Sequence, residues 1–273
     1  MLSVTSDYVV STGCPEPYLR AIAEAGFSHV HWCHEWNTDR LYTADEVAQI
    51  ARWLKQFGLG VTDLHASAGA ERRWGAPRPD VRQAGEGLVI NRIDMAAELG
   101  TDVIILHLPD RAGAGAAGDA PAYWDGVWAS LDVLTAAACG RGVRIALENG
   151  RFDDLERVFA RYGPEAVGLC YDAGHGNLIP DGLDRLAALA GRLISIHLHD
   201  NDGAADQHRL PFTGTVDWRR LTGILARSSY AKWPNLESTM AHYPGRDERD
   251  FLAEAFVAAT RLADMIAAAR DDE

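Results

Sequence analysis

Short apolar segments alternate with longer segments of helical periodicity along the whole chain. Residues 41–58 and 86–100, for example, repeat apolar positions three and four apart and end in glycine, which commonly stops a helix. Strands that alternate with such helices form right-handed βαβ units and a parallel sheet. The eight predicted strands are Tyr8–Thr12, His29–Trp36, Val61–Ala66, Asp102–Leu108, Arg144–Glu148, Val167–Tyr171, Leu193–Leu198 and Pro234–Glu237.

The length of the chain favours closure of these eight units into a barrel. A (β/α)8 barrel typically needs ~250 residues, and this chain has 273. We therefore expect α/β architecture with a single (β/α)8 TIM barrel domain over residues 1–273. A segment rich in glycine and alanine, residues 111–121, follows the fourth predicted strand and is either a mobile lid or an ordinary surface loop.

Composition narrows the range of partners. Lys and Arg number 26 against 39 Asp and Glu, a net charge of −13, whereas non-specific nucleic-acid binding requires cationic surface. No apolar run reaches the ~18 residues of a membrane span, and no basic segment precedes an apolar one at the N-terminus. The four cysteines form no CxxC pair, which disfavours thiolate zinc sites and disulfides. We expect a soluble, cytoplasmic protein that does not bind nucleic acid or membranes.

Metal-ligating residue types gather at the ends of the predicted strands. Active sites of such barrels lie at the C-terminal ends of the strands, and six of the 10 histidines fall there together with four carboxylates. Imidazole and carboxylate together suit Zn, Mn, Fe or Co and disfavour a pure calcium site. These residues are His65, His107, Glu148, Asp172, His175, His197, His199, Asp206, His208 and Glu237.

Four of these side chains come from strands that are neighbours in a barrel. Glu148, Asp172, His197 and Glu237 end predicted strands five to eight. His199 lies two residues beyond His197, so the two side chains point to the same side of the strand. Carboxylates gathered inside a protein need protons or cations to compensate their charge. The pattern therefore predicts a divalent metal centre at this end of the barrel.

The motifs around these residues resemble the xylose-isomerase-like barrel superfamily over nearly the whole chain. The matching stretches are LENG at Glu148, DAGHGN at 172–177, HLHDN at 197–201, DQHRLPFTG at 206–214 and NLEST at Glu237. The superfamily contains sugar and sugar-phosphate isomerases and epimerases, and also metal-dependent endonucleases that act at abasic sites in DNA.

The two branches imply different ligand sets. In the epimerase branch, the resemblance implies one metal held by Glu148, Asp172, His197 and Glu237, with both glutamates also facing the substrate as proton donor and acceptor. In the endonuclease branch it implies further ions, up to three in all. With one ion or three, we expect zinc or manganese as the metal. The additional ligands would be His65 and His107 beside Glu148, and His175, Asp206 and His208 together.

Two departures disfavour the endonuclease branch. The segment ENGRFDD, which begins at Glu148, lacks the small-residue, glycine-containing run that follows the glutamate in that branch, and DAGH stands where that branch favours a cysteine before His175. The leading hypothesis is therefore a metal-dependent isomerase or epimerase of a sugar or sugar phosphate. Glu148 and Glu237 would transfer a proton at the carbon next to a carbonyl that the metal polarises.

Substrate contacts and two alternatives complete the prediction. We expect a small sugar-like substrate, and a homo-oligomer is compatible with the sequence. One alternative is a metal-dependent phosphodiester hydrolase with up to three ions, and the other is a sugar- or metal-binding protein without turnover. The candidate substrate contacts are His199, Asp200, Arg209, Trp36 and Trp74.

Overall fold

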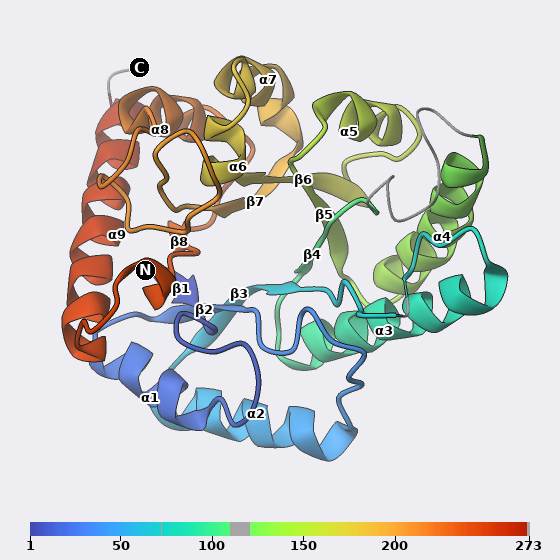
Figure 1. Cartoon of the computed structure of the whole chain (residues 1–273), viewed down its shortest axis with the longest axis horizontal. Helices are drawn as coiled ribbons and strands as arrows, with labels where there is room; N and C mark the ends of the chain where they lie inside the picture. The colour runs from blue at the N-terminus through green and yellow to red at the C-terminus, as the bar shows by residue number, and fades with distance from the viewer. Residues whose placement is uncertain (72, 110–120, 272–273) are drawn as a thin grey trace.

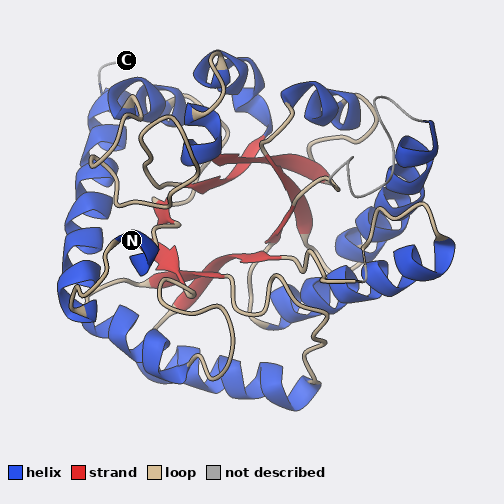
Figure 2. Ribbon diagram, viewed as in Figure 1, coloured by secondary structure: helices blue, strands red, loops and turns tan. Residues whose placement is uncertain are grey.

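The computed structural model describes residues 1–71, 73–109 and 121–271. Within these residues, eight parallel strands surround a central axis and helices cover them on the outside (Figure 1 and Figure 2). The protein is a (β/α)8 TIM barrel, as the sequence predicts. The strands are β1 (Ser3–Thr5), β2 (His29–Trp32), β3 (Gly60–His65), β4 (Val103–Leu106), β5 (Arg144–Glu148), β6 (Val167–Asp172), β7 (Leu193–His197) and β8 (Asn235–Leu236).

The sheet closes between β7 and β8. Its strand order is β7-β6-β5-β4-β3-β2-β1-β8, and every pair of neighbours in this order is parallel. A parallel bridge between Leu198 and Leu236 joins the two ends, and the Leu198 amide donates to the Asn235 carbonyl over 2.9 Å. Closure brings the C-terminal ends of all eight strands to one end of the barrel.

The helices form the outer layer (Figure 2). Helix α2 shows how local sequence sets their ends: Thr43 and Glu46 form a capping box at its start, and Gly58 ends it with a φ of 69°. None of the described helices is long and apolar enough to cross a membrane. The α-helices are α1 (Glu16–Glu24), α2 (Ala44–Phe57), α3 (Pro79–Glu98), α4 (Pro121–Cys139), α5 (Phe152–Phe159), α6 (Ala173–Asn177), α7 (Gly182–Leu189), α8 (Trp218–Ala226) and α9 (Glu248–Asp271). The short 3₁₀ helices are η1 (Ala190–Arg192) and η2 (Met240–His242).

Alternation along the strands separates two cores. On β5, Ile145 and Leu147 belong to the large core between barrel and helices, whereas Ala146 belongs to a small cluster inside the barrel. Successive side chains of a strand point to opposite faces, so Glu148 shares the inner face with Ala146. The same alternation places the chemistry-bearing strand ends inside the barrel.

The first predicted strand is wrong. Tyr8–Thr12 forms bends and irregular coil, and Val9 and Val10 are 42% and 38% exposed. Strand β1 is instead Ser3–Thr5, which pairs with β2 and β8. Its three residues are too few to show a period of two. The apolar Tyr-Val-Val run that follows it resembles a strand more closely, so the sequence pattern predicts the first strand there.

The other predicted strands agree with the structure within a residue or two, except at the end of the second. Strand β2 stops at Trp32 instead of Trp36, because the chain turns away there and Glu35 takes a φ of 58°. The predicted loop over residues 111–121 lies, apart from Pro121, outside the described residues.

Candidate metal centre

The predicted strand-end residues converge at one end of the barrel. Six of them are buried, with exposed fractions from 0% to 7%: His65, Glu148, Asp172, His197, His199 and Glu237. A cavity of about 310 Å³ opens between them and the loops. Within it and directly beneath it, the site residues form three groups.

The first group joins β3, β4 and β5. His65 Nε2 lies 3.2 Å from His107 Nε2, and the two nitrogens lie 3.6 Å and 3.3 Å from Glu148 Oε2. His65 Nδ1 lies 2.9 Å from the carbonyl oxygen of Ala66. A carbonyl only accepts a hydrogen bond, so the neutral His65 carries its proton on Nδ1 and presents the Nε2 lone pair to Glu148 and His107. Three donor atoms thus face one point, which is a ligand arrangement for a cation.

The second group lies on the loops after β6 and β7. His175 Nε2 and His208 Nε2 lie 3.3 Å and 3.1 Å from the same oxygen of Asp206. Their Nδ1 atoms lie 3.2 Å and 2.8 Å from the carbonyl oxygens of Asn149 and Glu237. These backbone contacts fix both rings with Nε2 toward Asp206, so two imidazoles and one carboxylate again share a focus.

The third group occupies the centre. His197 Nδ1 lies 3.3 Å from Glu237 Oε2, 3.4 Å from Glu148 Oε1 and 4.0 Å from Asp172 Oδ2. His199 Nε2 is 2.8 Å from Asp172 Oδ2 and its ring stacks on His208. The predicted core ligands therefore meet in space, and His199 contacts Asp172 more closely than His197 does.

Strong electrostatic coupling links these groups. Burial raises the pKa of Glu148, but the charges of His107 and His197 outweigh it and hold that pKa well below its usual range. The charge of Asp172 raises the pKa of His175 to about 11 against the effect of burial. Burial lowers the pKa of His208, yet the hydrogen bond with Asp206 and the charge of Glu237 raise it to about 10. Without a metal, protons on the histidines compensate the carboxylates.

The donor set fits a divalent metal. Both nitrogens of His197, Nδ1 of His199 and Oε2 of Glu148 are buried and have no hydrogen-bond partner among the described residues. Buried polar atoms without partners are costly, and a cation would satisfy them directly. The mixture of imidazole and carboxylate is the one that zinc and manganese accept.

A polar network below the centre was missed by sequence reasoning. His31 on β2 places Nδ1 at 2.6 Å from Asp63 Oδ1 and Nε2 at 3.5 Å from Glu237 Oε1. Ser195 donates a hydrogen bond to the other oxygen of Asp63, and the amide nitrogen of Asn235 lies 3.3 Å from Asp63 Oδ1. The strand-end rule selects His65 but not Asp63. Asp63 lies two residues earlier on the same strand, so its side chain shares the face of His65.

The predicted substrate contacts divide into two kinds. The ring centroid of Trp36 lies 4.8 Å from that of His65, and Trp74 is buried nearby. Arg209 lies apart from the cavity lining and pairs with Asp202 at 3.7 Å. The Asp200 carboxylate accepts hydrogen bonds from Trp218 Nε1 and the Val216 amide, so it holds its loop in place.

Comparisons with known proteins support this architecture. A family model described as xylose isomerase-like TIM barrel matches residues 19–255. An uncharacterized protein of Sinorhizobium fredii is 33% identical, over 93% of this chain and 90% of its own length. A probable endonuclease 4 of Mycobacterium tuberculosis is 31% identical over 75 residues, which cover 24% of this chain and 30% of that protein.

A solved structure extends the likeness in fold. The crystal structure of a D-tagatose 3-epimerase-like protein superimposes with a TM-score of 0.78 at 16% identity, covering 99% of this chain and 98% of that one. The motif resemblance is thus confirmed at the level of the family model and of the fold. The chain belongs to the xylose isomerase-like TIM barrel family.

Proposed function

We propose that the protein is a metal-dependent isomerase or epimerase of a small sugar-like hydroxy-carbonyl compound, free or phosphorylated. The observation that carries this proposal is that carboxylate oxygens of Glu148 and Glu237 both lie close to Nδ1 of His197, at 3.4 Å and 3.3 Å. Two buried carboxylates about one centre can each reach the same carbon of a bound substrate. The name of the structural neighbour, a D-tagatose 3-epimerase-like protein, points to the same reaction class.

In the proposed mechanism, the glutamates move the proton. One carboxylate removes the proton from the carbon next to the carbonyl, and the other returns a proton to the neighbouring position or opposite face. A divalent metal, when bound, polarises the carbonyl and acidifies that C–H group. Between turnovers the first glutamate releases its proton to solvent and the second takes one up, so a reaction in D₂O places deuterium on the substrate.

For the ligands, we propose Glu148, Asp172, Glu237 and His197 as the core, with zinc or manganese as the ion. His199 joins this set in our proposal, because its Nε2 lies 2.8 Å from Asp172 and its Nδ1 has no partner among the described residues. Loss of metal from a His199→Ala variant, measured by elemental analysis, supports the assignment. Full retention of metal by that variant contradicts it.

A second candidate is the phosphodiester hydrolase with up to three ions. The groups His65, His107, Glu148 and His175, Asp206, His208 favour it, since each has three donors around one focus. Extra ions activate water and hold the leaving oxygen in such hydrolases. The net charge of −13 opposes a nucleic-acid substrate, so this function remains second.

One experiment separates the two candidates. The metal-loaded protein is assayed on ketoses and ketose phosphates in D₂O, and on a DNA duplex with an abasic site. We expect deuterium at the carbon next to the carbonyl and no cleavage, with His208→Ala less impaired than Glu237→Gln. Duplex cleavage that disappears in His208→Ala would instead establish the hydrolase.

A further inference from the structure

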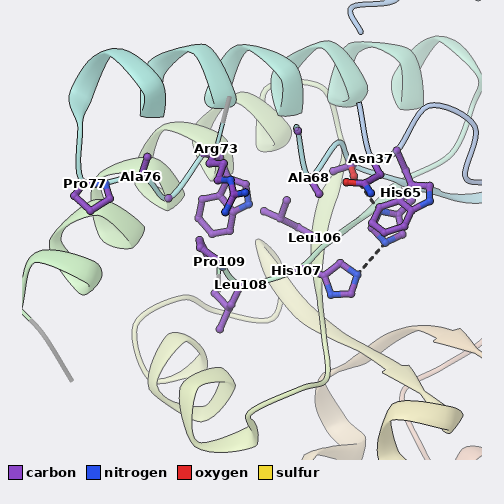
Figure 3. A pocket seen from close by; sticks show the side chains of 15 residues that line it. Asn37, His65, Ala68, Arg73, Ala76, Pro77, Leu106, His107, Leu108 and Pro109 are labelled. Atoms are coloured by element: carbon purple, nitrogen blue, oxygen red, sulfur yellow. Dashed lines mark hydrogen bonds between the residues drawn. The ribbon is translucent and has the colours of Figure 1, made fainter. Parts of the chain in front are cut away.

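A second cavity, of about 400 Å³, adjoins the metal centre. It lies between the β3–α3 loop and the end of β4, and it opens beside His65 and His107 (Figure 3). Those two histidines and Trp36 also line the cavity of the metal centre. A single ligand can therefore occupy both cavities at once.

The walls of this cavity are apolar, unlike those of the metal centre. Beyond the two histidines, the described lining residues include Asn37 and the exposed Arg73 as polar side chains, and no described lining residue is acidic. Sugar hydroxyls placed there would lose their hydrogen bonds with water and find few partners. The remaining lining consists of Trp36, Ala66, Ala68, Gly69, Trp74, Gly75, Ala76, Pro77, Leu106, Leu108 and Pro109.

The loop that forms one wall is held firmly by its neighbours. A Cβ atom at Gly85 of α3 would lie 2.2 Å from the Trp74 backbone nitrogen, so the helix packs directly on the loop. Ser130 of α4 donates a hydrogen bond to the Trp74 carbonyl. At Gly75 a Cβ would lie 2.1 Å from Pro109, which shows how closely the two walls approach. The cavity is thus shaped by packed elements.

We propose that this cavity binds an apolar ring attached to the sugar-like substrate, so that the natural substrate is a glycoside or a similar conjugate. The inference rests on the proposed function for the polar half of the ligand. Trp36, at the junction, lies 4.8 Å from His65 and can stack on the ring. Pockets of several hundred Å³ with apolar walls and a few convergent polar groups are typical of small-molecule sites.

The test compares two glycosides whose sugar ring carries the same ketone, one with a phenyl and one with a methyl aglycone. Their dissociation constants are measured calorimetrically on the metal-loaded protein. We expect the phenyl compound to bind about tenfold tighter or more, as apolar pockets discriminate between groups differing in size. Equal binding of the two compounds, or no detectable binding of the phenyl compound, would overturn the proposal.

Filling variants locate the binding site. Ala68 and Ala76 line the cavity from separate points of the loop, whereas Ala70 is exposed and lies outside the lining. We expect Ala68→Phe and Ala76→Phe each to bring the phenyl-to-methyl ratio near one without weakening methyl binding. Ala70→Phe is the matched control and should keep the wild-type ratio. A ratio unchanged in both filling variants would overturn the proposal.

Deuterium exchange on the methyl glycoside separates this inference from the proposed function. Exchange without a phenyl preference leaves the function intact and refutes the apolar subsite. A phenyl preference that the filling variants abolish, with no exchange on either compound, supports the subsite and refutes the isomerase or epimerase.

Discussion

Backbone carbonyl groups determine how the histidines of the centre present their nitrogens. Ala66, Asn149 and Glu237 each offer a carbonyl oxygen to the Nδ1 atom of one histidine. The Nε2 atoms are thereby directed toward carboxylates before any ligand arrives. Such orientation lowers the entropic cost of binding, because the rings need not be immobilised afterwards.

The paired glutamates lead to the first prediction. Glu148→Gln and Glu237→Gln each remove a proton acceptor and keep an oxygen of similar size near the metal. Turnover should fall by ~10²–10⁴-fold for each, the usual contribution of a positioned acid or base. The measurement is deuterium incorporation into the substrate, with elemental analysis as control for retained metal. A variant that retains metal and exchanges at the wild-type rate would show that its glutamate is not the base.

Asp63 gives a second prediction, on stability. Its carboxylate is the shared acceptor for His31, Ser195 and Asn235, all fully buried inside the barrel. Asp63→Ala leaves these groups without their acceptor and removes the carboxylate whose charge and hydrogen bond, against the effect of burial, help raise the pKa of His31 to about 9. Breaking a buried pair from one side costs ~3–5 kcal/mol.

Chemical denaturation measures that loss. The control is Asp80→Ala, since Asp80 pairs with Arg78 on the exposed surface, where such pairs contribute little. Equal unfolding free energies for the two variants would show that the buried network adds no stability.

At the same scale, the limits of prediction from sequence have a clear geometric origin. The strand-end rule brought Glu148, Asp172 and Glu237 to one place, because parity and barrel closure follow from pattern alone. It did not find His31 or Asp63, which lie one layer deeper. Their contacts depend on how strands stagger in the closed barrel, and a single sequence does not show that register.

At the scale of elements, segments with their own sequence signals were predicted well, whereas strand β1 was not. Helix α2 carries its own start and stop signals in Thr43, Glu46 and Gly58, and its observed range follows them. Strand β1 carries no such signal in its three residues, and its position depends on pairing with β2 and β8. Tertiary pairing therefore decides where β1 forms.

The cap of α2 gives a third prediction. Thr43 accepts a hydrogen bond from the Glu46 amide, and the Glu46 carboxylate accepts one from the Thr43 amide. Thr43→Ala should lower the free energy of unfolding by ~0.5–2 kcal/mol. Thr260→Ala serves as the matched control, because Thr260 lies exposed within α9 and its hydroxyl donates to the Phe256 carbonyl of its own helix. A control loss as large as that of Thr43→Ala would refute the capping argument.

At the scale of the whole molecule, the barrel concentrates charge at one end. Closure brings side chains from β3 to β8 into a space where Glu148, Asp172, Asp206 and Glu237 lie within a few ångströms of histidines. The chain as a whole, these carboxylates included, has a net charge of −13, and the resulting field attracts cations. Fold and charge together favour a bound metal.

Metal removal is the last prediction and follows from this compensation. In the metal-free protein, protons on His175 and His208 neutralise part of the carboxylate charge, and buried atoms of His197 and Glu148 keep no hydrogen-bond partner among the described residues. A ligand that binds only the folded state stabilises it by ~2.7 kcal/mol at a concentration of 100 Kd. Dialysis against a chelator should therefore lower Tm, and added Mn²⁺ or Zn²⁺ should restore it.

The concentration dependence distinguishes specific binding from a general effect of salt. Linkage requires Tm to rise with the logarithm of free metal above Kd, whereas K⁺ at equal ionic strength should not reproduce the rise. Asp172→Asn, which keeps the size of a proposed ligand and removes its charge, should shift the dependence to higher metal concentration. A Tm that ignores both chelator and added metal would mean that the converging histidines and carboxylates stabilise one another without a cation, and the proposed chemistry would lose its Lewis acid.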